Sequence, residues 1–325
     1  MFPGTYRVQV RGYSSNLPSE AFTVRQGLTV SGPVSNLTLD VVTHPVSGVV
    51  TMNGQQPTSG CGSSDRAYVD FTEPSLGYHH TLAVPCNGAT SPFAFSGSVF
   101  PGTYRVQVRG YSSNLPSEAF TVRQGLTVSG PVSNLTLDVV THLVAGTVTM
   151  NGQQPISSCG SSDRAYVDLD DDNLGYHHTI AVPCDGASSP FAFDGDVFPG
   201  TYRVSVRGYS SNIPSERFVA LPSLSVGQDA TGLVLDVVTV PVGGVVTMNG
   251  QQPMSSCGSS DRAYVDFHDS VQGYSHTVNV PCNGATSAFT FQGLVYPGVY
   301  RISVRGYSST LPSEAYIVFD RVQIP

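Results

Sequence analysis

The residues best suited to form a covalent link are six cysteines, which fall as three pairs with a constant spacing of 25 residues. The pairs are Cys61 with Cys86, Cys159 with Cys184, and Cys257 with Cys282. An even count, with one pair in each stretch of similar sequence, predicts three intra-repeat disulfides and an oxidising compartment. Reduced core thiols are the alternative. The case for a zinc site is weaker still, because each cysteine stands alone without a Cys-x-x-Cys partner.

Histidine pairs invite a metal-binding interpretation. The pairs are His79-His80 and His177-His178. Successive residues of a strand point to opposite faces, so one strand cannot aim both rings at a single ion. A third stretch keeps only the second histidine, as His276. We therefore expect packed or hydrogen-bonded histidines and predict neither a metal site nor a cofactor.

One acidic run contains enough oxygen ligands to suggest calcium. It comprises Asp168, Asp170, Asp171, Asp172 and Asn173. The run lacks the glycine and the distal glutamate of a helix-loop-helix calcium site. The corresponding stretches elsewhere read Phe-Thr-Glu-Pro-Ser and Phe-His-Asp-Ser-Val. We therefore expect a solvated loop.

Serine, histidine and aspartate all occur, which raises the question of a hydrolase. The motif Cys-Gly-Ser-Ser-Asp-Arg-Ala-Tyr-Val-Asp begins at Cys61, Cys159 and Cys257. Nothing resembles Gly-x-Ser-x-Gly, and no base is placed by spacing. The motif predicts a disulfide followed by a turn and a strand, so we predict no catalytic residue and no enzyme activity.

Two rows of polar side chains should face outward from neighbouring strands. They are Arg66, Tyr68 and Asp70 on one strand, and Arg105, Gln107 and Arg109 on another. Tyrosine and arginine are common in binding surfaces, and such rows could bind glycans or a neighbouring chain. A solvated sheet face with local ion pairs is the favoured interpretation.

Asn36-Leu-Thr38 and Asn134-Leu-Thr136 match the N-glycosylation acceptor pattern. Asn36 and Asn134 are therefore candidate glycosylation sites.

These residues must be positioned by one unit that repeats every 98 residues. The segment 2–44 recurs unchanged as 100–142, and the step Phe-Pro-Gly or Tyr-Pro-Gly begins at Phe2, Phe100, Phe198 and Tyr296. The period is too long for a solenoid turn, so each repeat is expected to be a domain. We divide the chain into a partial repeat with the later strands only (1–44), two β-sandwich repeats (45–142 and 143–240), and a β-sandwich repeat lacking its last strand (241–325).

Met1 stands where the other copies have Val99, Val197 and Val295. A GTG codon encodes valine internally and methionine at a start. We therefore expect Met1 to be a start assigned inside a longer array.

Alternating apolar residues and regular turn signals predict seven short strands in each full copy. In the first full copy they are 46–52, 66–71, 78–84, a strand through Phe93 and Phe95, 104–109, 119–122 and 135–140. Asn53-Gly54 should close the first strand with a tight turn. Seven strands in about 100 residues are typical of a two-sheet sandwich. The predicted fold class is all-β: a tandem array of seven-stranded Ig-like or prealbumin-like β-sandwich domains.

Two stretches carry a family resemblance. Val46-Ser-Gly-Val-Val-Thr-Met-Asn-Gly-Gln-Gln-Pro and Phe100-Pro-Gly-Thr-Tyr-Arg-Val-Gln-Val-Arg-Gly-Tyr resemble the carboxypeptidase regulatory-like domain. That family is similar to the B-type repeats of collagen adhesins, and both have prealbumin-like sandwiches. The resemblance implies a secreted or surface protein in which the module spaces or attaches something else. Adhesin B-type repeats often carry a Lys–Asn isopeptide crosslink, which this chain cannot form because it has no lysine.

Composition narrows the function further. The net charge is −8 and the basic residues form no clusters, which argues against a nucleic-acid partner. The sequence contains no apolar run of 18 residues, so we expect no membrane span. We predict a non-enzymatic extracellular or cell-surface structural protein, a tandem-repeat stalk or filament (fibre) subunit that assembles head to tail with copies of itself. The alternative is a glycan- or surface-binding module array of an adhesin or secreted enzyme. The candidate acceptor sites predict that the protein is a glycoprotein.

Overall fold

The computed structural model describes residues 2–13, 21–273 and 275–325, so Met1 lies outside the described residues. These residues form strands and turns without any helix, and hence none that is long and apolar enough to cross a membrane. The chain divides into two compact units, Met1–Thr141 and His142–Pro325. The predicted all-β fold class is confirmed.

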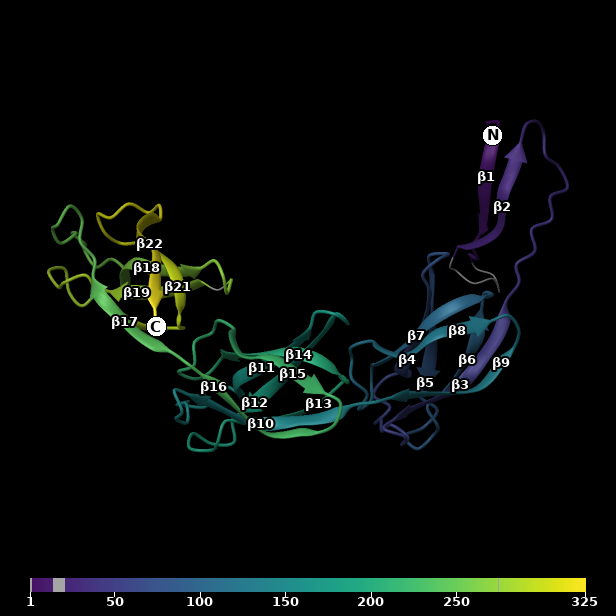
Figure 1. The fold of residues 1–325 in the computed structure, drawn as a ribbon, viewed down its shortest axis with the longest axis horizontal. Helices are drawn as coiled ribbons and strands as arrows, with labels where there is room; N and C mark the ends of the chain where they lie inside the picture. Colours follow the sequence, from purple (N-terminus) through teal and green to yellow (C-terminus); the bar gives the residue numbers. More distant parts are fainter. Residues whose placement is uncertain (1, 14–20, 274) are drawn as a thin grey trace. The chain divides into compact units, whose positions relative to one another are not determined.

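The first full copy is a sandwich of two sheets (Figure 1). The smaller sheet has the order β6 (Ala94–Val99), β3 (His44–Met52), β9 (Val132–Val139). The larger sheet has the order β5 (Tyr78–Pro85), β4 (Asp65–Glu73), β7 (Gly102–Gly110), β8 (Phe120–Val128). A strand is present at each of the seven predicted places, although β6 begins at Ala94 and so leaves the predicted Phe93 just outside it. The sixth extends beyond the prediction, to Val128, because bulges in its pairing with β7 accommodate the turn-like residues before Leu126.

Period-two alternation explains which side chains fill the space between the sheets. In β7, Tyr104, Val106 and Val108 are at most 1% exposed, while Arg105 between them is exposed. The residues Ala67, Val69 and Phe71 of β4 are fully buried opposite them. Each sandwich therefore has its own core.

A two-residue turn follows β3, as the Asn-Gly pair predicts. Asn53 and Gly54 have φ angles of 50° and 73°, in the left-handed region. Met52 and Gln55 exchange two backbone hydrogen bonds across the turn, of 2.8 and 3.0 Å. These values fit the tight turn that Asn-Gly favours.

The smaller sheet is closed by a parallel strand. β3 pairs antiparallel with β6 and parallel with β9, which places Val50 opposite Leu137. The register shifts at Gly48, where a Cβ atom would lie 2.2 Å from the carbonyl oxygen of Leu135. Glycine is therefore required at this position for β9 to approach β3.

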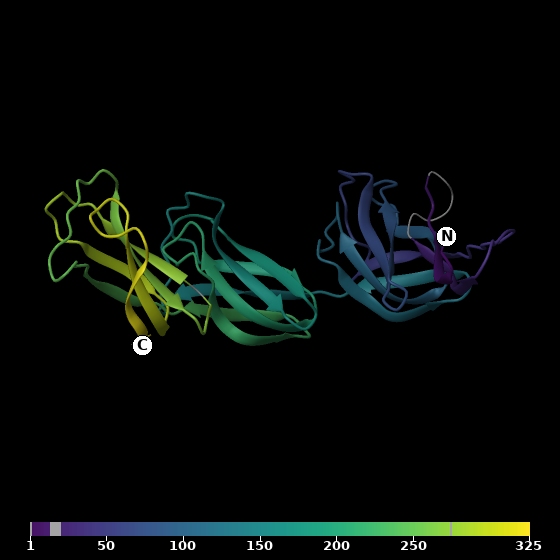
Figure 2. The same cartoon turned by 90° about the horizontal axis from the view of Figure 1, so that it is seen from above.

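The second full copy repeats this arrangement within the second unit (Figure 2). Its smaller sheet has the order β13 (Ala192–Val197), β10 (His142–Met150), β16 (Ala230–Val237). Its larger sheet has the order β12 (Tyr176–Pro183), β11 (Asp163–Asp171), β14 (Gly200–Gly208), β15 (Phe218–Val226). A core of Val144, Phe193, Val204 and Leu235, each at most 2% exposed, joins the two sheets.

The third copy retains the larger sheet but only two strands of the smaller one. The larger sheet has the order β19 (Ser275–Pro281), β18 (Asp261–Asp269), β21 (Gly298–Gly306), β22 (Tyr316–Ile324). The smaller sheet pairs β17 (Val240–Val245) with β20 (Thr290–Val295). In the part of the chain that the structure describes, no strand takes the place of β9 or β16.

The partial copy at the start of the first unit is a two-stranded sheet. β1 (Gly4–Val10) pairs antiparallel with β2 (Phe22–Val30). Residues 31–43 then run to β3 outside any strand (Figure 1).

Candidate functional site

The structure joins each of the three cysteine pairs. Cys61 is bonded to Cys86, Cys159 to Cys184 and Cys257 to Cys282, each with a Cα–Cα distance of 5.7 Å. That distance lies within the usual range for disulfides. The bond ties the irregular segment before β4 to the loop that follows β5. A covalent crosslink therefore sits at the same place in every sandwich.

Arg66 is fully buried, so the expected exposure of this side chain to solvent is wrong. Its Nε, Nη1 and Nη2 atoms donate to the carbonyl oxygens of Pro85, Ser91 and Pro92 at 3.1, 2.9 and 2.6 Å. The guanidinium lies 4.0 Å from the centroid of the Phe93 ring. Arg164 and Arg262 make the same contacts in their own copies. The arginine therefore fixes the loop that carries the second cysteine.

Burial without a carboxylate partner is unusual for an arginine and has an electrostatic cost. Accordingly, burial lowers the pKa of the Arg66 guanidinium. Three carbonyl oxygens and an aromatic face compensate for the lost water. Strand alternation did place Arg66 on the outer face of β4. The loop after β5 covers that face, and strand alternation cannot predict such a cover. The one sequence signal was that the arginine stands at the same motif position in all three copies.

Asp70 is also buried on this face, at 5% exposure, and pairs with the predicted outward residue Arg109. The Arg109 Nε atom lies 3.0 Å from Asp70 Oδ2, and the Thr81 hydroxyl donates to Oδ1. The equivalent pairs Asp168–Arg207 and Asp266–Arg305 are 2.8 Å apart. The expectation of local ion pairs is thus confirmed, whereas the expected solvation of Asp70 is wrong.

An aromatic cluster stands at the exposed end of this ion pair. Arg109 lies 4.5 Å from the centroid of the Tyr68 ring, and the rings of Tyr68 and Tyr111 are 5.6 Å apart. Tyr111 is 64% exposed. The same tyrosine–arginine–tyrosine cluster occurs at Tyr166, Arg207 and Tyr209, and at Tyr264, Arg305 and Tyr307. We call it the surface tyrosine cluster, and sequence reasoning missed its exposed member.

The histidines make local hydrogen bonds, as expected. His79 Nδ1 lies 3.0 Å from the Thr72 hydroxyl, and His177 Nδ1 lies 2.6 Å from Asp170 Oδ1. In the third copy, His276 Nδ1 lies 2.9 Å from Glu216 Oε1 of the preceding copy. The described residues contain no group of three or more histidine, cysteine or acidic side chains arranged to hold a metal ion.

The acidic run is not a solvated loop, contrary to our expectation. Asp168, Asp170 and Asp171 belong to β11, and Asp168 and Asp171 are at most 2% exposed. Asp171 Oδ1 accepts from the backbone N–H groups of Asn173 and Leu174, each at 2.9 Å. Glu73 and Asp269 accept hydrogen bonds from residues of the equivalent turns in the first and third copies. A buried carboxylate therefore stabilises the turn after β4, β11 and β18, and the only sequence signal was an acidic residue at that position in each copy.

The Cys-Gly-Ser-Ser-Asp-Arg motif forms structural contacts. Asp65 accepts from the Tyr68 hydroxyl at 3.3 Å, and Arg66 is engaged as described above. Within the described residues, no serine hydroxyl of this motif hydrogen-bonds a histidine.

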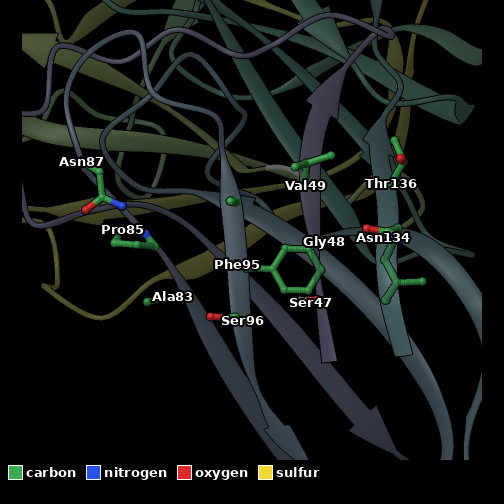
Figure 3. A pocket seen from close by; sticks show the side chains of 12 residues that line it. Ser47, Gly48, Val49, Ala83, Pro85, Asn87, Phe95, Ser96, Asn134 and Thr136 are labelled. Atoms are coloured by element: carbon green, nitrogen blue, oxygen red, sulfur yellow. The ribbon is translucent and has the colours of Figure 1, made fainter. Parts of the chain in front are cut away.

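The glycosylation candidates are both exposed and both adopt left-handed backbone, with φ of 57° at Asn36 and 59° at Asn134. Gly232, with φ of 71°, stands at the same place in the second full copy. Asn134 borders a hollow of about 720 Å³ over the smaller sheet, together with Ser47 and Ser96 (Figure 3). The left-handed backbone is therefore sufficient to explain why asparagine stands at this position. Glycosylation stays a prediction.

Aromatic contacts join neighbouring copies within each unit. In the first unit, the rings of Phe22 and Phe100 are stacked with centroids 4.2 Å apart. In the second unit, the rings of Phe218 and Tyr296 are 4.9 Å apart, and the Tyr296 hydroxyl donates to the carbonyl oxygen of Glu216 at 2.6 Å. The Phe-Pro-Gly step thus supplies one side of an inter-repeat joint.

No protein-family model and no curated protein matches the chain. The similar solved structures include a leucine-rich repeat protein from Bacteroides thetaiotaomicron (16% identity, 60% of this chain, 26% of that one, TM-score 0.24) and a DUF3823 family protein from Parabacteroides merdae (16%, 57%, 99%, 0.22). A tetra-tandem repeat from the extending region of a large adhesion protein matches with 13% identity over 84% of this chain and 73% of that one, at a TM-score of 0.14. The chain spans about a quarter of the leucine-rich repeat protein. These scores assign no family, so the carboxypeptidase regulatory-like resemblance stays a prediction.

Proposed function

We propose that this chain is a non-enzymatic extracellular structural protein, a stalk or filament subunit in which disulfide-crosslinked sandwiches are joined in series and assemble head to tail. The observation that carries the proposal is the joint within each unit. Phe22 with Phe100, and Phe218 with Tyr296, form aromatic contacts at equivalent positions, the first stacked and the second tilted. Two residues separate β16 from β17, which leaves little room for a flexible linker.

The polar side chains agree with this role. The buried arginines and the turn-stabilising carboxylates hold loops in place. This use of polar side chains favours a structural role over a catalytic one. One disulfide per sandwich is typical of an oxidising, extracellular setting.

Small-angle scattering combined with electron microscopy of the native material tests the proposal. We expect an elongated particle with little bending between copies. The double variant Phe218→Ala/Tyr296→Ala should increase bending at the joint. Leu174→Ala, which removes an exposed side chain from the turn after β11, should not. A compact or broadly flexible native particle would contradict the proposal.

The second candidate function is glycan binding, and the surface tyrosine cluster favours it. Tyr111, Tyr209 and Tyr307 are each at least 63% exposed and recur with the repeat. Exposed aromatic rings beside arginine suit the apolar faces and hydroxyl groups of sugars. A glycan array with the wild-type chain and with the triple Tyr→Ala variant tests this function. Signals that survive the triple variant would rule out the cluster as the binding site.

A further inference from the structure

A hollow of about 440 Å³ lies against β21 in the third copy, between the turn after β18 and strand β22. Its charged lining comes from three neighbouring strands: His268 from β18, Arg301 from β21, and Asp320 and Arg321 from β22. His268 and Arg301 pair directly across the sheet. All four side chains are exposed to solvent. We call this place, with these four residues in its lining, the basic hollow.

A bulge in β22 brings Arg321 to the basic hollow. Two residues of β22, Asp320 and Arg321, lie opposite Arg301 alone in the pairing with β21. Arg321 has a φ of 61°, in the left-handed region that residues with a Cβ atom disfavour. The first full copy has Gly125 at this place, with a φ of 70°. An unfavourable backbone conformation retained at a bulge points to a side chain that is aimed for a function.

The second full copy has different charges at the same place. Asp170 stands where the third copy has His268, and its Oδ2 atom lies 3.8 Å from Arg203 and 3.4 Å from Arg217. Ser223 stands where the third copy has Arg321. The second full copy thus balances its arginines with a carboxylate on the neighbouring strand.

The third copy leaves two of its basic side chains without such a partner. The Nε atom of Arg301 lies 3.4 Å from Asp320 Oδ1. In the part of the chain that the structure describes, neither the Arg321 guanidinium nor the His268 ring has a hydrogen-bond or ion-pair partner. These donors are available to an anion from solution.

A buried acid lies beside the basic hollow, but its carboxylate is already engaged. Asp269 is 1% exposed and accepts from the backbone N–H groups of Val271, Gln272 and Val299. Asp320 is the acidic member of the lining. Two arginines therefore face one exposed carboxylate, and His268 adds positive charge when it is protonated.

The same face stays open where another copy follows. In the second unit the third copy follows the second, and Arg203 is still 48% exposed. Ser223 is exposed as well. The contacts of the joint lie instead at Glu216 and Phe218, at the start of β15. Exposure is therefore a property of this face of the sandwich.

We propose that the basic hollow binds an oxyanion group, a sulfate or a carboxylate, of an acidic polysaccharide. A guanidinium presents paired N–H donors whose geometry matches both groups. The hollow is open to solvent and has the volume of a small-molecule site rather than of a single ion, which favours a group carried on a sugar chain. The inference goes beyond the proposed stalk, because it gives one copy a ligand that the other copies do not share.

Biolayer interferometry with the immobilised 325-residue chain tests the proposal. Dextran sulfate supplies sulfate groups, polygalacturonate supplies carboxylates, and unmodified dextran is the neutral control. We expect at least one charged polymer to bind and the neutral one not to bind; the stronger of the two charged polymers identifies the preferred group. Absence of binding to both charged polymers would overturn the inference.

Arg321→Gly should weaken this binding about tenfold, because a charge-assisted contact is lost. The variant should fold, because it restores the residue that Gly125 provides at the same bulge. Arg203→Ala removes one positive charge from the second full copy and should leave the affinity unchanged, as should Ser223→Gly at the equivalent bulge. Equal affinity of Arg321→Gly and the wild type would overturn the inference.

Removing the competing carboxylate should have the opposite effect. Asp320→Asn should strengthen binding about threefold, because Arg301 then turns its donors to the ligand. Asp185→Asn makes the same change of charge in the exposed loop after β12 and should not strengthen binding. The triple Tyr→Ala variant of the surface tyrosine cluster should bind as the wild type does. Loss of binding in that variant would overturn the basic hollow as the site, and neither result bears on the bending that tests the stalk.

Discussion

The second and third sandwiches lie in one unit and differ mainly in one strand. β10 spans nine residues and β17 spans six, although both copies have the same Val-Thr-Met-Asn-Gly sequence here; β10 includes its first three residues, whereas β17 ends before it. In β10 the later residues Val148, Thr149 and Met150 pair with β16. In the third sandwich no such neighbour is found among the described residues, and β17 ends at Val245. The length of a strand here is therefore set by its partner as well as by its own residues.

The larger sheets of the two sandwiches are alike. Arg164 and Arg262 are both fully buried and make equivalent hydrogen bonds. Among the described residues, the difference in strand number between the two copies lies in the smaller sheet. Variants that act on one sheet or the other separate these contributions.

The largest expected effect comes from the buried arginine. Arg164→Ala and Arg262→Ala should each lower the free energy of unfolding of their own sandwich by about 4 kcal/mol, because three carbonyl oxygens lose their donor and a void opens beside an aromatic ring. Peptide-resolved hydrogen exchange measures the loss in each copy separately. The exposed Arg203→Ala is the control. Unequal losses in the two sandwiches would show that the missing strand also affects the larger sheet.

Removing one core side chain should make the second sandwich resemble the third. Leu235→Ala should lower the free energy of unfolding of the second sandwich by about 3 kcal/mol, because Leu235 is fully buried and its removal leaves a cavity. Hydrogen exchange should then rise in Val148–Met150 and across β16. Val234→Ala is the matched control, since Val234 is 63% exposed. Protection that persists after Leu235→Ala would mean that backbone pairing alone holds β16.

The disulfides should stabilise both sandwiches equally. The double variant Cys159→Ala/Cys184→Ala should lower the free energy of unfolding of the second sandwich by roughly 3 kcal/mol, because the crosslink restricts the unfolded chain. Cys257→Ala/Cys282→Ala should lower that of the third sandwich by the same amount. Thermal unfolding followed copy by copy measures the loss. Non-reducing peptide mapping should find the three links within copies; free thiols or links between copies would contradict the assignment.

The smallest expected effect is a pH dependence at the joint between these sandwiches. Burial raises the pKa of Glu216, but the hydrogen bond with His276, a backbone hydrogen bond and the charge of His276 together outweigh burial and leave the pKa below its ordinary value of 4.5. The contact therefore contributes fully above that value and is lost as the pH falls through the lowered pKa. Scattering should show more bending at the joint below this range. Glu216→Gln should remove the pH dependence, and a wild-type joint that is unchanged by acid would count against the contact.

The sequence alone determined the features that depend on neighbouring residues. Alternation in β7 placed Tyr104, Val106 and Val108 in the core, and Asn53-Gly54 predicted the turn after β3. The constant spacing of the cysteines predicted the pairs that the structure joins. These signals are readable because strand periodicity and turn conformation are local properties.

Only the tertiary structure decided the environment of the polar side chains and the extent of the strands. Alternation placed Arg66 and Asp70 on the outer face, but the loop that covers Arg66 and the arginine that pairs with Asp70 come from distant parts of the chain. Likewise, β17 ends at Val245, where the described residues place no closing strand beside it, although the sequence that follows is the same as in the longer β10. Burial and pairing depend on which segments meet, and a single strand's pattern does not contain that information.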